Sequence, residues 1–184
     1  MRYRNLGSTG LQVSVVGLGT NNFGRKLDEK KSIAVVENAL DVGINFIDTA
    51  NVYGGGLSEE YIGNALRGKR ENVVITTKFG FKIADGVNMS GASRAHLTRE
   101  LENSLKRLNT DYIDLYLIHF PDSKTPIEET LFALDDAVRQ GKVRYIGCSN
   151  FSSWEICEAV WNTKVHNLNP ISCLQSQYNM IERD

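Results

Sequence analysis

Short runs of apolar residues alternate along this chain with longer segments in which apolar residues recur every three or four positions. The short runs are rich in Val, Ile and Leu, which is typical of buried strands, and the longer segments have the period of helices with one buried face. Residues 1–14 precede them as a small hairpin that turns at residues 7–10. We therefore expect strands at residues 13–18, 44–48, 73–78, 112–119, 143–149 and 171–175, and helices at residues 28–42, 58–68, 93–108, 126–139 and 152–161.

Residues that begin and end helices flank these segments. Ser58 and Ser93 are suited to cap a helix N-terminus, because a serine hydroxyl accepts a hydrogen bond from the first turn. Gly43 and Gly141 follow two of the helices, where glycine readily takes the backbone conformation that ends a helix. These signals support the predicted boundaries.

Strands that alternate with helices predict a parallel sheet joined by right-handed crossovers. This α/β pattern leaves two architectures, a doubly wound sheet or a (β/α) barrel. The first strand-to-helix loop, residues 17–24, lacks the G-x-G-x-x-G spacing of a Rossmann loop, so we favour the barrel. Three prolines and the absence of a low-complexity run indicate one domain over residues 1–184, with no linker.

The end of each predicted strand carries a polar side chain. In a barrel all strands point the same way, so their carboxyl ends meet at the rim that carries catalysis in such folds. A tyrosine also follows the second strand, beside three glycines. The residues that we expect to meet at this rim are Asp48, Tyr53, Lys78, His119, Ser149, Asn150 and Gln175.

These side chains suit proton transfer to a carbonyl oxygen. A phenol has a pKa of about 10, and an adjacent Lys78 ammonium stabilises phenolate, so we expect Lys78 to lower the pKa of Tyr53. Asp48 would hold the lysine, and His119 would donate a hydrogen bond to the carbonyl. The chain has three histidines, at positions without metal-ligand spacing, which argues against a metal site.

Charge and composition narrow the range of partners. With 21 basic and 22 acidic side chains, the net charge of -1 offers no electrostatic reason to bind nucleic acid or an anionic membrane. No apolar run is long enough to cross a bilayer, and the N-terminus lacks the apolar region of a secretory signal. Three cysteines without metal-like spacing favour reduced thiols and a cytoplasmic protein.

Several motifs in order make the chain resemble the aldo-keto reductases, and specifically bacterial-type members. The resemblance implies a TIM-type (β/α)8 barrel that uses NADP(H) to reduce a small-molecule aldehyde or ketone. Asp48, Tyr53, Lys78 and His119 match the family's catalytic tetrad, with Tyr53 as the proton donor. Gly19, Thr20, Asn21, Asp48, Ser149, Asn150 and Gln175 match cofactor-binding positions. The matching segments are residues 43–54, 75–78, 104–119, 141–150 and 175–179.

The chain departs from the family in its length. About 250 residues are typical of such barrels, and the sequence stops after the sixth predicted strand, so two βα units and the C-terminal loop are expected to be absent. We therefore interpret it as a fragment that binds NADPH weakly and has impaired activity. The unpaired edges of the first and sixth strands would then promote self-association.

Two other functions fit the same residues. Some relatives in this family serve as channel-associated subunits that bind cofactor and catalyse little. Lys78 could instead form a Schiff base, as in a barrel aldolase, although Asp48 and Tyr53 suit a charged lysine better. The physiological carbonyl, the preference for NADPH over NADH and the oligomeric state stay open at this point.

Four further positions carry structural expectations. Asp114 interrupts an apolar strand and should be a buried structural hydrogen-bonding group. We expect His96 to face solvent, and Trp154 and Trp161, seven positions apart, to lie on the packed face of a helix.

Overall fold

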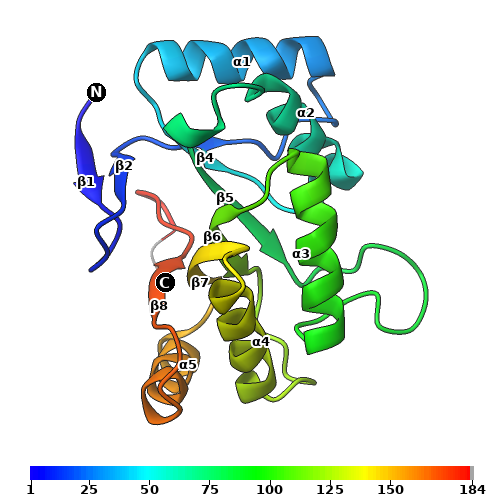
Figure 1. Cartoon of the computed structure of the whole chain (residues 1–184), viewed down its shortest axis with the longest axis vertical. Coiled ribbons are helices and arrows are strands. Elements are labelled where there is room, and N and C mark those ends of the chain that lie inside the picture. Colours follow the sequence, from blue (N-terminus) through cyan, green and yellow to red (C-terminus); the bar gives the residue numbers. More distant parts are fainter. Residues whose placement is uncertain (183–184) are drawn as a thin grey trace.

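The computed structural model describes residues 1–182, which form a short hairpin and one curved parallel sheet covered by helices (Figure 1). The hairpin pairs β1 (Tyr3–Asn5) with β2 (Gln12–Ser14) in antiparallel register. The sheet contains six parallel strands in the order of the sequence, which is the topology that alternating strands and helices predict. Its strands are β3 (Leu18–Gly19), β4 (Phe46–Asp48), β5 (Val74–Phe79), β6 (Ile113–Ile118), β7 (Val143–Ser149) and β8 (Ile171–Gln175).

Five α-helices connect these strands, and each helix contacts the next one along the chain. Figure 1 shows them following one another around the outside of the strands, with the hairpin on the opposite side. None of the helices among residues 1–182 is long and apolar enough to span a bilayer. The helices are α1 (Glu29–Asp41), α2 (Leu57–Ala65), α3 (Arg94–Leu108), α4 (Ile127–Arg139) and α5 (Ser153–Val165), with short 3-10 turns at Tyr53–Gly56 and Arg70–Asn72.

The sheet and helices confirm the predicted fold class, a partial (β/α)8 barrel with an N-terminal hairpin. Ser93 caps α3 as expected, because its Oγ accepts a hydrogen bond from the backbone N–H of His96. Ser58 was expected to cap α2 and does not, since the helix begins at Leu57 after Gly56. The first strand is also shorter than predicted, because residues 12–14 belong to the hairpin and only Leu18–Gly19 pairs with β4.

The core lies between the sheet and the helices. Strands β5 and β6 are buried along their whole length, as expected for central strands of a parallel sheet. Asp114 is confirmed as a structural group: it is buried on β6 and its carboxylate pairs with Arg70 at 2.7 Å and with Arg144 at 2.9 Å. It also accepts the backbone N–H of Ile75, so that one side chain fastens β5 to β6.

Two of the structural expectations were wrong. His96 is fully buried at the start of α3, whereas it was expected to face solvent. Trp154 and Trp161 are 67% and 68% exposed on α5, whereas a packed face was expected there. Seven-residue spacing places the two indoles on one face of the helix, but the buried residues of α5, Ala159 and Thr163, lie on another.

Candidate active site

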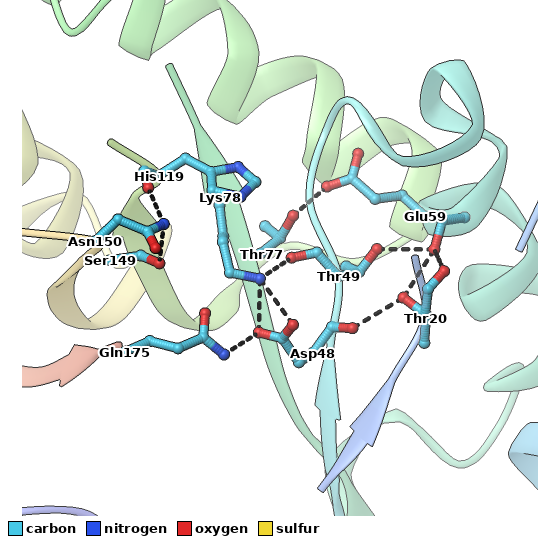
Figure 2. A network of polar contacts seen from close by, with 11 residues as sticks. Thr20, Asp48, Thr49, Glu59, Thr77, Lys78, His119, Ser149, Asn150 and Gln175 are labelled. Atoms are coloured by element: carbon cyan, nitrogen blue, oxygen red, sulfur yellow. Dashed lines mark hydrogen bonds and ion pairs between the residues drawn. The ribbon is translucent and has the colours of Figure 1, made fainter. Parts of the chain in front are cut away.

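Asp48 and Lys78 form the centre of the site at the carboxyl ends of β4 and β5 (Figure 2). The Lys78 ammonium lies 2.7 Å and 2.8 Å from the two carboxylate oxygens of Asp48, and 2.8 Å from the backbone carbonyl of Thr49. Burial lowers the pKa of Lys78, while the Asp48 carboxylate opposes that shift. Three oxygen acceptors therefore hold a cation that is almost completely removed from water.

Gln175, at the end of β8, reaches the same carboxylate from the last strand of the sheet. Its Nε2 donates to Asp48 Oδ1 over 3.1 Å, although 127 residues separate the two positions. Strands β4 and β8 are not neighbours in the sheet. Their ends meet because the sheet curves, and this brings the polar strand ends together around a common opening, as a barrel does.

Tyr53 and His119 lie beside this pair. The Lys78 ammonium is 5.3 Å from the centre of the Tyr53 ring, and the Tyr53 and His119 rings meet edge to face at 5.9 Å. Burial, and the neighbouring Asp48 carboxylate, raise the pKa of Tyr53. Burial, and the neighbouring Lys78 cation, lower the pKa of His119 to about 4.

The direction of the Tyr53 shift differs from the sequence-based expectation that Lys78 would lower this pKa. The ammonium is directed at Asp48 and at a backbone carbonyl, so its charge is largely neutralised by the carboxylate. The desolvation of the phenol then dominates, because a phenolate in a partly buried position loses more hydration than a phenol does. Tyr53 is accordingly a neutral phenol at neutral pH.

A group of buried hydroxyls fixes the loops behind the pair. Ser58 Oγ lies 2.9 Å from Thr20 Oγ1 and 2.9 Å from Thr49 Oγ1. Thr20 Oγ1 donates to the backbone carbonyl of Asp48 over 2.9 Å (Figure 2). This explains why Ser58 does not cap α2. Its hydroxyl is used to join the first loop to the segment whose carbonyl accepts the Lys78 hydrogen bond.

The remaining predicted residues occupy the same end of the sheet. Asn150 Nδ2 donates to the His119 carbonyl over 2.9 Å and to Ser149 Oγ over 3.0 Å. Ser149 is buried, and Asn150 is exposed with a positive φ of 60°. Gly19 and Asn21 are exposed at the end of β3. The Thr20 side chain instead takes part in the buried hydrogen bonds with Ser58 and Asp48 described above.

A second set of buried polar side chains supports the strands from behind and escaped the sequence analysis. Glu59 accepts hydrogen bonds from Thr77 over 2.5 Å and from Arg107 over 2.7 Å, and burial raises its pKa while Arg107 opposes the shift. Asn51 donates to the buried Glu100 over 2.8 Å. Each carboxylate meets its partner across at least 18 residues of sequence, so no local motif signals the contact.

The fold places the chain in the class of TIM-type (β/α) barrels, in which the carboxyl ends of the strands form the functional rim. Residues 15–184 match the model of the aldo/keto reductase family. The chain belongs to the aldo/keto reductase family.

Individual relatives agree with this assignment. The aldo-keto reductase YhdN of Bacillus subtilis is 42% identical over 190 residues, and the match covers 100% of this chain and 56% of YhdN. A protein described as a probable voltage-gated potassium channel subunit beta, from rice (Oryza sativa subsp. japonica), is 40% identical and is covered over 57% of its length. The crystal structure of Tm1743, a thermostable aldo-keto reductase in complex with the inhibitor epalrestat, superposes with a TM-score of 0.88 at 40% identity, and 65% of it is covered.

The chain thus spans a little more than half the length of the curated relatives that it matches.

Proposed function

We propose that this chain is part of an NADPH-dependent reductase that converts an aldehyde or ketone to an alcohol, with Tyr53 as the proton donor. The observation that carries the proposal is the position of Tyr53 at 5.3 Å from the ammonium of a lysine that Asp48 holds in place. A phenol beside a buried cation suits a group that must lose a proton during the reaction, because the part of the Lys78 charge that Asp48 leaves unneutralised offsets the phenolate charge that results.

Tyr53 and His119 suit different roles because their pKa values are shifted in opposite directions. A raised pKa keeps Tyr53 protonated until negative charge develops on the substrate oxygen. A pKa of about 4 keeps His119 neutral at pH 7, so that its imidazole orients the carbonyl oxygen without competing as an acid. Asp48 is the positioning residue for Lys78 in this scheme.

The side chains at the strand ends fit a nicotinamide cofactor. Ser149, Asn150 and Gln175 present a hydroxyl and two amides at adjacent strand ends, which matches the donors and acceptors of a carboxamide. The buried Nδ1 of His119 has no protein partner among residues 1–182, which leaves a polar group for a bound molecule to satisfy. When bound, the cofactor supplies the hydride that reduces the carbonyl carbon.

The test is NADPH oxidation with 4-nitrobenzaldehyde, followed by absorbance. Tyr53→Phe removes the proton donor and keeps the ring, so we expect the rate to fall by roughly 10²- to 10⁴-fold while the thermal unfolding temperature changes little. A Tyr53→Phe variant that is as active as the unchanged protein would refute the assigned role.

A second candidate is a regulatory, channel-associated subunit that binds cofactor without turning it over. The name of the rice relative, a probable voltage-gated potassium channel subunit beta, supports the channel association. Cofactor binding by the protein without oxidation of NADPH by any aldehyde would favour it. A Schiff-base aldolase fits less well, because Lys78 is held as a cation by Asp48, and borohydride trapping of an adduct on Lys78 would support that function. We also propose a cytoplasmic location, since Cys148, Cys157 and Cys173 are free thiols.

A further inference from the structure

A cavity of about 510 Å³ opens beside Tyr53. Its walls come from the first loop, from the turn after β4 and from the residues that follow β5, and they include Arg25, Val52, Tyr53 and Phe81 together with three glycines. This volume lies in the range of small-molecule sites. Because Tyr53 forms part of the wall, a molecule in this cavity would lie next to the proposed proton donor.

Phe81 belongs to the cavity wall, and the rings of His119 and Phe120 lie next to it outside the wall. Phe81 meets the His119 ring edge to face at 4.5 Å and the Phe120 ring at 5.0 Å. Phe81 and Phe120 nevertheless stay 40% and 45% exposed. Exposed aromatic surface beside polar reacting groups is what an aryl or alkyl portion of a ligand would cover.

Arg25 supplies the charge of the cavity. Of the lining residues, all of which lie between positions 24 and 81, Arg25 is the one that is charged at neutral pH. Within residues 1–182 no carboxylate lies close enough to form an ion pair with its guanidinium. A guanidinium presents paired donors whose geometry matches a carboxylate, and it stays charged at every pH that the protein experiences.

The backbone that carries Arg25 is held firmly next to Tyr53. The backbone N–H groups of residues 25, 26 and 27 all donate to the carbonyl of Asn22, at 3.2 Å, 2.9 Å and 3.1 Å. Phe23 anchors the loop in the core with 2% exposure. A Cβ at Gly54 would lie 2.5 Å from the Phe23 carbonyl, so the loop and the Tyr53 turn touch through their backbones.

We propose that the cavity selects carbonyl substrates that combine an apolar, preferably aryl, body with a carboxylate, and that Arg25 binds this carboxylate. The proposal rests on the reductase function above and specifies its substrate class. Phe81 and Phe120 would contact the apolar body, Tyr53 and His119 the carbonyl, and Arg25 the anionic end. Arg25 is therefore a specificity-determining residue for the reaction.

A matched pair of substrates tests this selection. 4-Carboxybenzaldehyde and methyl 4-formylbenzoate have the same ring and aldehyde and differ in charge. We expect kcat/KM to favour the carboxylate about fivefold at low salt, as for a partly exposed ion pair. The preference should shrink as ionic strength rises, because salt screens the interaction.

Two variants locate the effect. Arg25→Gln should abolish the preference by raising KM for the acid and leaving that for the ester unchanged. Lys26→Gln, a change to the next cation along the loop and outside the cavity wall, is the matched control and should keep the preference. An unchanged ratio in Arg25→Gln would overturn the proposal. So would a raised KM for NADPH with both aldehydes unaffected, because Arg25 would then bind a cofactor phosphate.

Ligand-observed NMR separates this proposal from the reductase function. 4-(Hydroxymethyl)benzoate, the product of the acid, should bind more tightly to the protein than its methyl ester does, and Arg25→Gln should remove the difference. If neither aldehyde is reduced, the reductase proposal fails, and this binding comparison alone decides whether Arg25 recognises a carboxylate. Equal binding of acid and ester would overturn that recognition.

Discussion

Asn51 and Glu100 share a buried hydrogen bond of 2.8 Å, although 49 residues separate them in the sequence. Asn51 lies two positions before Tyr53, and its backbone N–H also donates to the carbonyl of Lys78 over 3.1 Å. Helix α3 therefore helps to fix the segment that carries the tyrosine against the strand that carries the lysine. Neither Asn51 nor Glu100 belongs to the strand-end group that the sequence singles out.

Replacing Glu100 should loosen this segment. Glu100→Ala leaves the Asn51 amide buried without an acceptor, which we expect to destabilise the protein by about 1–3 kcal/mol and to lower kcat more than it raises KM. Urea unfolding and steady-state kinetics measure the two effects. Glu100→Gln keeps an oxygen acceptor and is the control that should retain most of both, and a Glu100→Ala variant with unchanged stability and kcat would contradict the role.

Removing only one partner of the Lys78–Asp48 pair should lower the free energy of unfolding. Lys78→Met removes the partner of a largely buried carboxylate, and we expect a loss of roughly 3 kcal/mol in the free energy of unfolding. Adding Asp48→Asn to Lys78→Met removes the uncompensated charge and should recover part of that loss. Chemical unfolding of the single and double variants checks this, and a double variant less stable than Lys78→Met would argue against the pairing.

His119 should make stability depend on pH. The folded protein protonates His119 at about pH 4, and an unfolded chain protonates histidine at about pH 6.5. Between these values the unfolded state binds more protons, so stability is full above about pH 6.5 and falls as the pH drops toward 4, by on the order of 2 to 3 kcal/mol.

The comparison with His119→Asn isolates this contribution. Several aspartates with lowered pKa values, among them Asp122 and Asp135, also weaken the fold at low pH, but they are present in both proteins. The unfolding free energy of the unchanged protein minus that of His119→Asn should decrease as the pH falls from 6.5 to 4. Parallel pH profiles would show that His119 does not titrate as described.

Gly63 lies where α2 approaches α3. A Cβ there would stand 2.7 Å from the carbonyl oxygen of Arg107 and 2.8 Å from that of Leu108, both of which are backbone atoms. Gly63→Ala should therefore destabilise the protein by about 1–3 kcal/mol through overpacking, despite the better helix propensity of alanine. Gly10→Ala, whose Cβ meets nothing within 4 Å, is the control for thermal unfolding. A stabilised Gly63→Ala variant would show that the helices can move apart.

The sequence was sufficient to predict the order of strands and helices, because apolar runs and helical periods are local patterns. It also predicted that Asp48, Lys78, His119 and Gln175 would gather, since parallel strands bring their ends to one rim. Hydrogen bonds join Asp48 to Lys78 and to Gln175, and the His119 and Tyr53 rings are in contact. The chemical roles of these residues stay predictions.

The positions that escaped prediction depend on contacts between distant segments. A serine before a helical segment predicts an N-cap, yet the Ser58 hydroxyl forms a hydrogen bond with Thr20, 38 positions away. His96 is buried because α3 packs on the core, and hydrophobic periodicity does not report where one polar residue of a helix points. The pKa of Tyr53 depends on how far the phenol is buried and on how close the Asp48 carboxylate lies, and both are set only in the folded protein.

The contact between Asp48 and Gln175 also has a kinetic meaning. Because the two residues are 127 positions apart in the chain, the strands at both ends of this stretch must already be in register before the contact can form. During refolding, the environment of the Lys78 ammonium should therefore reach its native state late, after most helical signal has returned. Recovery of the site would then show that the sheet is fully formed. It would distinguish native molecules from collapsed intermediates that have regained their helices.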